Sequence, residues 1–76
     1  MTLAESKEGQ TVFVKKVKGT GASKRRLMDM GISKGTELKV ERFAPLLDPV
    51  QIRLKGYSLA LRRSECAFIE TEQNKS

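Results

Sequence analysis

The alternation of apolar and polar residues along the chain predicts a small β protein. In residues 36–43, Leu38 and Val40 fall on one side of an extended segment and charged residues on the other, the period-2 pattern of a half-buried strand. In residues 11–17, β-branched residues dominate, and the same spacing puts Val12, Val14 and then Lys16 on one face. The full set of expected strands is 11–17, 36–43, 50–54, 57–61 and 66–71.

One segment between the first two strands has helical spacing instead. Leu27 and Met30 are three residues apart on one face of a helix of roughly two turns, below the ~12–15 residues that stay helical alone in water. Ser23 is the expected N-cap, because its hydroxyl can accept from the free amides of the first turn. We expect Gly31 to end the helix in a left-handed conformation and Ile32 to fold back onto Leu27.

Turn residues separate these elements. Residues 8–10, 34–35 and 62–65 are expected turns, and Lys55-Gly56 a two-residue hairpin in which Gly56 adopts a positive φ. Pro45 and Pro49 interrupt the sheet pattern, because proline has no amide donor. Five short strands, one helix and tight turns predict a small closed barrel, and residues 72–76 are expected to fray.

The length of the chain predicts one domain, and its single cysteine suits a reducing compartment. The 76 residues, 38% of them hydrophobic, have room for one core, so we expect a single domain over 1–76. Cys66 is the one cysteine, which excludes an internal disulfide framework. No apolar run approaches the ~20 residues that span a bilayer. An acidic residue, Glu5, comes too early in the N-terminal segment for a secretory signal. We expect a cytoplasmic protein.

The charge balance indicates an acidic partner without choosing its class. The formal net charge of +6 suits nucleic acid, an anionic membrane surface or an acidic protein, and also an ordinary solvated surface. Six cations lie close in sequence and could form one basic patch: Lys15, Lys16, Lys18, Lys24, Arg25 and Arg26. A basic barrel that binds RNA is therefore the alternative function, although the aromatic residues that stack on bases are few.

The residues that carry catalysis and metal binding are scarce. The chain has no histidine, and one cysteine cannot form a thiolate cluster or a Cys–His pair. Glu37 and Glu41 share a strand face. We interpret this as a face exposed to water instead of a cation site. Gly19-Thr20-Gly21 precedes the helix without the spacing of a phosphate-binding loop and reads as a hinge. We expect no catalysis, no cofactor and no metal site.

The leucines between the two prolines are the strongest interaction signal. Leu46 and Leu47 are adjacent, so they cannot both face inward from an extended segment. We expect Leu46 to fold over the barrel mouth and Leu47 to stay exposed, where apolar surface on a loop marks a contact.

Three blocks of residues together resemble the ferrous iron transport protein A (FeoA) family. They are Arg26-Leu27-x-x-Met30-Gly31-Ile32-x-x-Gly35-Thr36, Ala44-Pro45-Leu46-x-Asp48-Pro49-Val50 and Leu59-Ala60-Leu61-Arg62. The resemblance spans about Leu3 to Thr71, and the A-P-L-x-D-P loop is its most distinctive part. It implies a small SH3-like barrel of about five strands with one short inserted helix. It also implies an accessory protein of FeoB, a membrane iron permease with a GTPase domain, that supports Fe(II) uptake without transporting or catalysing.

The resemblance also suggests which residues form the contact. The residues expected to bind the partner are Lys24, Arg25, Pro45, Leu46, Leu47, Asp48 and Pro49, with Asp48 also capping its own loop. Two positions depart from the family pattern, Leu47 where a small residue is usual and Cys66 where alanine is usual. We expect membrane contact only through the partner, no specific nucleic acid, and a monomer or weak homodimer.

Overall fold

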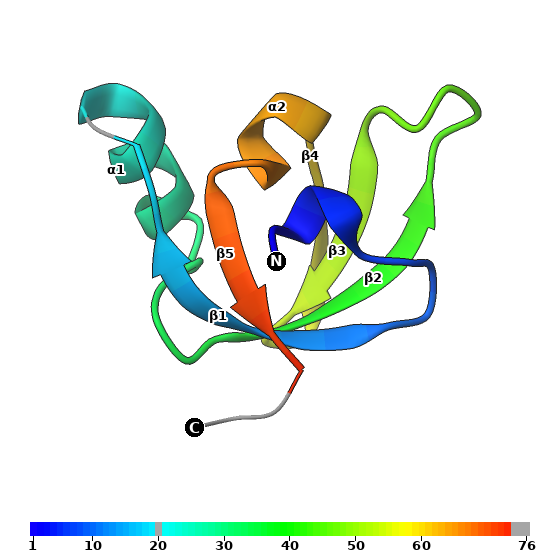
Figure 1. The fold of residues 1–76 in the computed structure, drawn as a ribbon, viewed down its shortest axis with the longest axis horizontal. Helices are drawn as coiled ribbons and strands as arrows, with labels where there is room; N and C mark the ends of the chain where they lie inside the picture. The colour runs from blue at the N-terminus through cyan, green and yellow to red at the C-terminus, as the bar shows by residue number, and fades with distance from the viewer. Residues whose placement is uncertain (20, 74–76) are drawn as a thin grey trace.

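The centre of the protein is a curled antiparallel sheet, seen in a computed structural model that describes residues 1–19 and 21–73 (Figure 1). Its five strands run in the order β4-β3-β2-β1-β5. They are β1 (Thr11–Val17), β2 (Glu37–Phe43), β3 (Val50–Leu54), β4 (Tyr57–Leu61) and β5 (Ile69–Glu72). The predicted mostly β fold of about five strands is confirmed. The sheet's edge strands β4 and β5 are not hydrogen-bonded neighbours, so the expected closure of the barrel is not made by hydrogen bonds between them.

Three helical segments accompany the sheet in the part of the chain that the structure describes, where one was predicted. They are α1 (Gly21–Asp29), the single-turn α2 (Arg63–Cys66) between β4 and β5, and a 3₁₀ turn η1 (Leu3–Glu5). Because α1 begins at Gly21, Ser23 lies inside the first turn, and its prediction as N-cap is wrong. Thr20, in the expected hinge before the helix, lies outside the described residues.

The end of α1 follows the prediction. Gly31 has φ +93°, and the Ile32 amide donates to the Leu27 carbonyl at 3.0 Å, while the Gly31 amide donates to Met28. This pair of hydrogen bonds is the Schellman arrangement, and it places both Leu27 and Ile32 in the core. The short helix is therefore held by packing, as its length requires.

A bulge in β1 changes the face that its last residues present. The pairing of β1 with β5 shifts between Val14 and Lys16. Val12 and Val14 are buried as expected, but beyond the bulge Val17 is buried and Lys16 is exposed. The prediction that Lys16 shares the face of Val12 is wrong, because one extra residue in a strand reverses the alternation after it.

The C-terminal strand starts later than predicted. Cys66 is buried but ends α2, and Phe68 is 41% exposed ahead of β5. Of the tail expected to fray, Glu72 lies in β5, and residues 74–76 lie outside the described residues. The expected turn at residues 62–65 is the start of α2.

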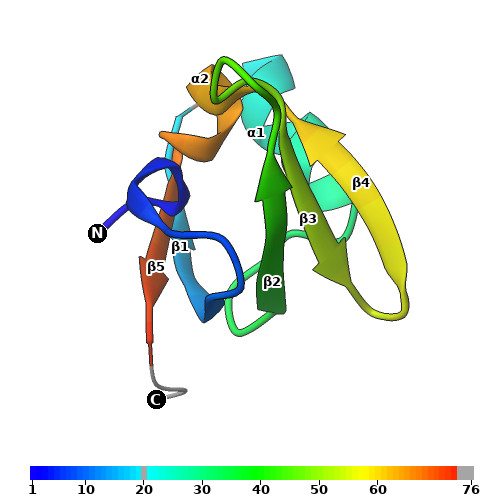
Figure 2. The same ribbon diagram turned by 90° about the vertical axis from the view of Figure 1, so that its right-hand side faces the viewer.

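Side chains of the β3–β4 hairpin, which Figure 2 shows side-on, contact the residues at the end of α1. Leu54 and Tyr57 pair across the predicted two-residue turn, in which Lys55 has φ +49° and Gly56 φ +84°. Tyr57 is 44% exposed, and its hydroxyl donates to the Met30 carbonyl at 2.5 Å. The hairpin thus ties the last residues of α1 to the sheet.

Candidate functional site

The loop of residues 44–49 forms a compact projection between β2 and β3. The Leu47 amide donates to the Ala44 carbonyl at 2.7 Å, which closes a turn with Pro45 and Leu46 at its corner. The Ala44 amide donates to the Pro49 carbonyl at 3.0 Å and closes the loop at its base. Every residue from Pro45 to Pro49 is exposed. The loop is therefore a built feature that offers its side chains to solvent.

Both leucines of the loop face solvent. Leu46 is 89% exposed, so the expectation that it folds over the barrel mouth is wrong: as a corner residue of the turn, it points away from the sheet. Leu47 is 51% exposed and has φ +65°. A left-handed conformation costs a residue with a Cβ roughly 1–2 kcal/mol, which glycine avoids. The chain keeps a leucine where backbone sterics favour a small residue.

Asp48 connects the loop to α2. Its Oδ1 accepts a hydrogen bond from the backbone amide of Arg63 at 2.9 Å, at the first residue of the helix. A carboxylate there satisfies a free amide and interacts favourably with the positive end of the helix. The expectation that Asp48 caps its own loop is wrong, because its acceptor is used by a segment 15 residues later.

The basic residues of α1 are exposed, and one of them forms an ion pair. Arg26 Nη1 lies 2.5 Å from Glu65 Oε2, so an ion pair joins α1 to α2. Lys24 and Arg25 are exposed and form no ion pair within the described residues. These two side chains are available to a partner, whereas Arg26 orients the helix.

The structure does not bring the seven predicted contact residues into one patch. Figure 1 shows α2 between α1 and the loop of residues 44–49, and Figure 2 shows the loop nearest the viewer with α1 behind. The two parts of the site are linked through α2, by Glu65 to Arg26 on one side and by the Arg63 amide to Asp48 on the other. We call the loop, α2 and α1 together the rim.

The positioning role of Arg63 and Glu65 was missed from the sequence. Glu65 accepts from the backbone amide of Arg62 at 2.9 Å, the reciprocal contact of a capping box, and its other oxygen holds Arg26. The signal was the spacing Arg62-x-x-Glu65, which is easily passed over because the cap residue is an arginine instead of serine or threonine. No local signal in the sequence indicates that Asp48 accepts a hydrogen bond from the backbone amide of Arg63.

The site lacks a strongly activated nucleophile or ligand cluster. Burial raises the pKa of the Cys66 thiol to about 12, and the charges of Glu65 and Asp48 add to the effect. Among residues 1–19 and 21–73, no group of three or more histidine, cysteine, aspartate or glutamate side chains is placed to hold a metal ion. No helix in the same residues is long and apolar enough to cross a membrane.

Comparison with known proteins decides the family. The model of the FeoA domain matches residues 1–73. The chain belongs to the FeoA family. A solved FeoA protein from Chlorobium tepidum is 42% identical, with a TM-score of 0.89 over 96% of this chain and 70% of that one. FeoA from Stenotrophomonas maltophilia, solved with zinc and described as an SH3 domain protein, is 28% identical, with a TM-score of 0.84 over 95% of this chain and 89% of that one. The predicted SH3-like barrel is thus confirmed.

One relative of this FeoA-family chain is much longer. It is the Fe(2+) transport protein A/Fe(2+) transporter FeoB fusion protein of Porphyromonas gingivalis, 38% identical over 72 residues. The match covers 95% of this chain but spans only 8% of the fusion protein's length. In that protein, a FeoA segment and the transporter are part of one polypeptide.

Proposed function

We propose that this FeoA-family chain is a cytoplasmic accessory module of a FeoB-like ferrous iron permease with a GTPase domain. It supports Fe(II) uptake by binding the transporter and neither transports nor catalyses. The contact surface is the rim, with the loop of residues 44–49 as its apolar part and, across α2 from the loop, Lys24 and Arg25 as its charged part.

The observation that carries the proposal is the fused relative. A segment 38% identical over nearly this whole chain is joined to the transporter FeoB in that protein. Joining two modules in one chain gives them an effective concentration that reaches mM for short flexible linkers. Such a fusion benefits two modules that act on each other, which supports a direct contact when they are separate chains.

The loop has the properties of a contact surface. Leu46 and Leu47 are 89% and 51% exposed, and burying a whole leucine side chain contributes about 1.5–3 kcal/mol. The hydrogen bonds within the loop, and the one that Asp48 accepts from α2, hold the loop in place before binding, which lowers the ordering entropy lost on association. The strained backbone of Leu47 fits this view, since strain is retained at functional positions.

The test is capture of the partner from native membranes. A tagged chain is incubated with a detergent extract, and the bound proteins are identified by mass spectrometry. We expect a GTPase-linked iron permease among them. If RNA and ribosomal proteins alone are recovered and salt releases them, the chain is a basic RNA-binding barrel and the proposal is wrong.

Variants of the loop make the test specific. Leu47→Asp and Leu46→Asp should each leave the far-UV spectrum unchanged and reduce recovery of the permease. Thr11→Asp is the matched control, because it adds the same charge at an exposed position of β1 that pairs with Lys39. Full recovery with both loop variants would remove the loop from the interface.

A further inference from the structure

A shallow hollow surrounded by lysines lies beside α1. Its volume is about 210 Å³, and Lys15, Lys16, Lys24, Lys34 and Met28 are among the residues that line it. Three separate segments supply these lysines: the end of β1, the exposed side of α1, and the turn before β2. The sequence suggested part of this cluster, but Lys34 joins it only through the fold.

Ion pairs do not cancel the charge of the four lysines. Within residues 1–19 and 21–73 none of them forms an ion pair, whereas their sequence neighbours Lys18 and Arg26 are paired with Glu70 and Glu65. Glu70 and Glu65 therefore compensate cations outside the hollow. One carboxylate, Glu72, lines an adjoining hollow with Lys15, Lys16 and Lys34, so the four lysines outnumber the acid beside them.

An apolar side chain lies among these charges. Met28 is 50% exposed, and it is four residues after Lys24, so both side chains lie on one face of α1. The nearest carboxylate along the helix, Asp29, is one residue further and points about 100° away around the axis. A methionine surrounded by lysines offers apolar contact and positive charge to the same partner.

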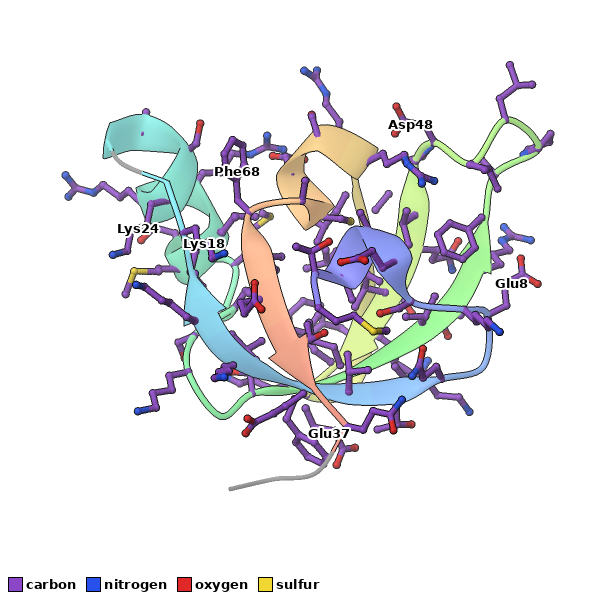
Figure 3. All side chains as sticks on the ribbon, viewed as in Figure 1. Glu8, Lys18, Lys24, Glu37, Asp48 and Phe68 are labelled. Carbon is purple, nitrogen blue, oxygen red and sulfur yellow. The ribbon has the colours of Figure 1, made fainter. Side chains whose placement is uncertain are left out.

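Two exposed acids lie far from the lysines of the hollow. Figure 3 shows Lys24 at one end of the longest axis and Glu8 and Asp48 toward the other. That axis measures 30 Å, longer than the screening length of about 8 Å at physiological ionic strength. An anionic surface therefore attracts the lysine end and is little affected by the acids at the far end.

We propose that this lysine face binds the surface of an anionic lipid bilayer. The lysines contact lipid phosphates, and Met28 inserts at the level of the headgroups. The proposal replaces the expectation that the chain touches the membrane only through its partner. It does not depend on the transporter, because lipid alone is the ligand.

The composition of the face favours a lipid surface over nucleic acid. Nucleic-acid grooves add aromatic platforms on which bases stack, and none of the residues lining this hollow is aromatic. The nearest ring, Phe13, is half-buried in an adjoining hollow that shares Lys15, Lys16 and Lys34. The two exposed aromatic residues, Tyr57 and Phe68, do not line this hollow. A planar surface needs only several cations on one side and an apolar side chain, which this face has.

The test is co-sedimentation with vesicles of phosphatidylcholine alone or mixed with phosphatidylglycerol. We expect binding to the mixed vesicles that weakens as salt rises, and none to phosphatidylcholine alone. A lysine near an anionic membrane contributes about 1 kcal/mol, which is roughly five-fold in partitioning. Lys15→Gln/Lys34→Gln should therefore lower partitioning about 25-fold. Met28→Gln should lower it on the mixed vesicles without changing its salt dependence.

A charge-matched control separates this face from net charge. Lys7→Gln/Lys39→Gln removes the same charge at exposed positions away from the hollow and should cost much less. Equal losses in the two double variants would overturn the proposal, as would no binding to the mixed vesicles at low salt or tighter binding to single-stranded RNA. Vesicle failure with intact capture of the permease would refute this inference and leave the proposed function standing.

Discussion

The Asp48 carboxylate accepts a hydrogen bond from the backbone amide of Arg63 at 2.9 Å and so joins the projecting loop to the first turn of α2. Replacing Asp48 by alanine leaves that amide without a side-chain acceptor. We expect Asp48→Ala to lower the free energy of unfolding by about 1 kcal/mol, the usual loss for a helix cap. Urea unfolding measures this change.

Asparagine at the same position gives the control. Asp48→Asn keeps an acceptor oxygen and removes the charge, so it should lose less stability than Asp48→Ala. If the two variants unfold at the same urea concentration as the unsubstituted chain, the hydrogen bond contributes nothing to stability.

The hairpin turn offers a stabilising substitution. Lys55 is exposed with φ +49°, followed by Gly56 with φ +84°, and two positive φ values are typical of a turn that favours Asn-Gly. We expect Lys55→Asn to raise the free energy of unfolding by about 0.5–1 kcal/mol, because asparagine tolerates this backbone better than lysine. Lys55→Ala, which removes the side chain without that tolerance, should show no gain. Thermal unfolding of both variants checks the turn.

Cys66 should be chemically inert in the folded protein. Burial raises the pKa of its thiol to about 12, so the reactive thiolate is scarce at pH 8. We expect iodoacetamide to modify Cys66 only after unfolding in urea, as measured by mass spectrometry. A Ser64→Cys/Cys66→Ala variant places the thiol at an exposed position and should react in the native state. Equal native rates for the two proteins would contradict the buried position of Cys66.

Glu70 should make the free energy of unfolding depend on pH in the acidic range. Its pKa is lowered to about 2, because the N-terminal ammonium group donates to it at 2.9 Å and Lys18 lies 3.1 Å away. The folded state therefore prefers the ionised carboxylate. This contribution is present above the ordinary pKa of 4.5 and is lost as the pH falls toward 2.

A neutral variant isolates this contribution. Glu70→Gln should be less stable than the unsubstituted chain at pH 6, and the difference should disappear near pH 2. Glu37→Gln is the control, because Glu37 is exposed and makes no ion pair or hydrogen bond through its side chain within the described residues. A difference for Glu70→Gln that is the same at both pH values would show that the carboxylate is not ionised preferentially in the folded state.

The parts of the fold that local signals specify were predictable from sequence. The run of β-branched residues gave the bounds of β1, and Gly31 with Ile32 gave the end of α1, because a strand's alternation and a helix's C-cap depend on residues within a few positions. The Lys55-Gly56 hairpin is predictable for the same reason.

The incorrect predictions concern residues whose positions depend on distant parts of the chain. Lys16 was assigned to the buried face because a bulge opposite β5 has no local signature. The sequence predicts the loop as a contact surface, but the exposure of Leu46 follows from the turn that closes around it. The acceptor role of Asp48 needs Arg63, which lies 15 residues later. Sequence reasoning thus located the candidate site but not the contacts that hold it.

The most direct test of the central claim is the dissociation constant between this chain and the purified FeoB-like permease from the same cell, measured for the unsubstituted chain and for Leu46→Asp. The Leu46 side chain is 89% exposed before binding, so the free energy of burying it is gained only when the complex forms. We predict saturable binding that Leu46→Asp weakens about ten-fold or more, the loss typical of an apolar anchor, while Thr11→Asp changes it little. Unchanged affinity for Leu46→Asp, or no binding of the unsubstituted chain, would contradict the proposal that the loop binds the transporter.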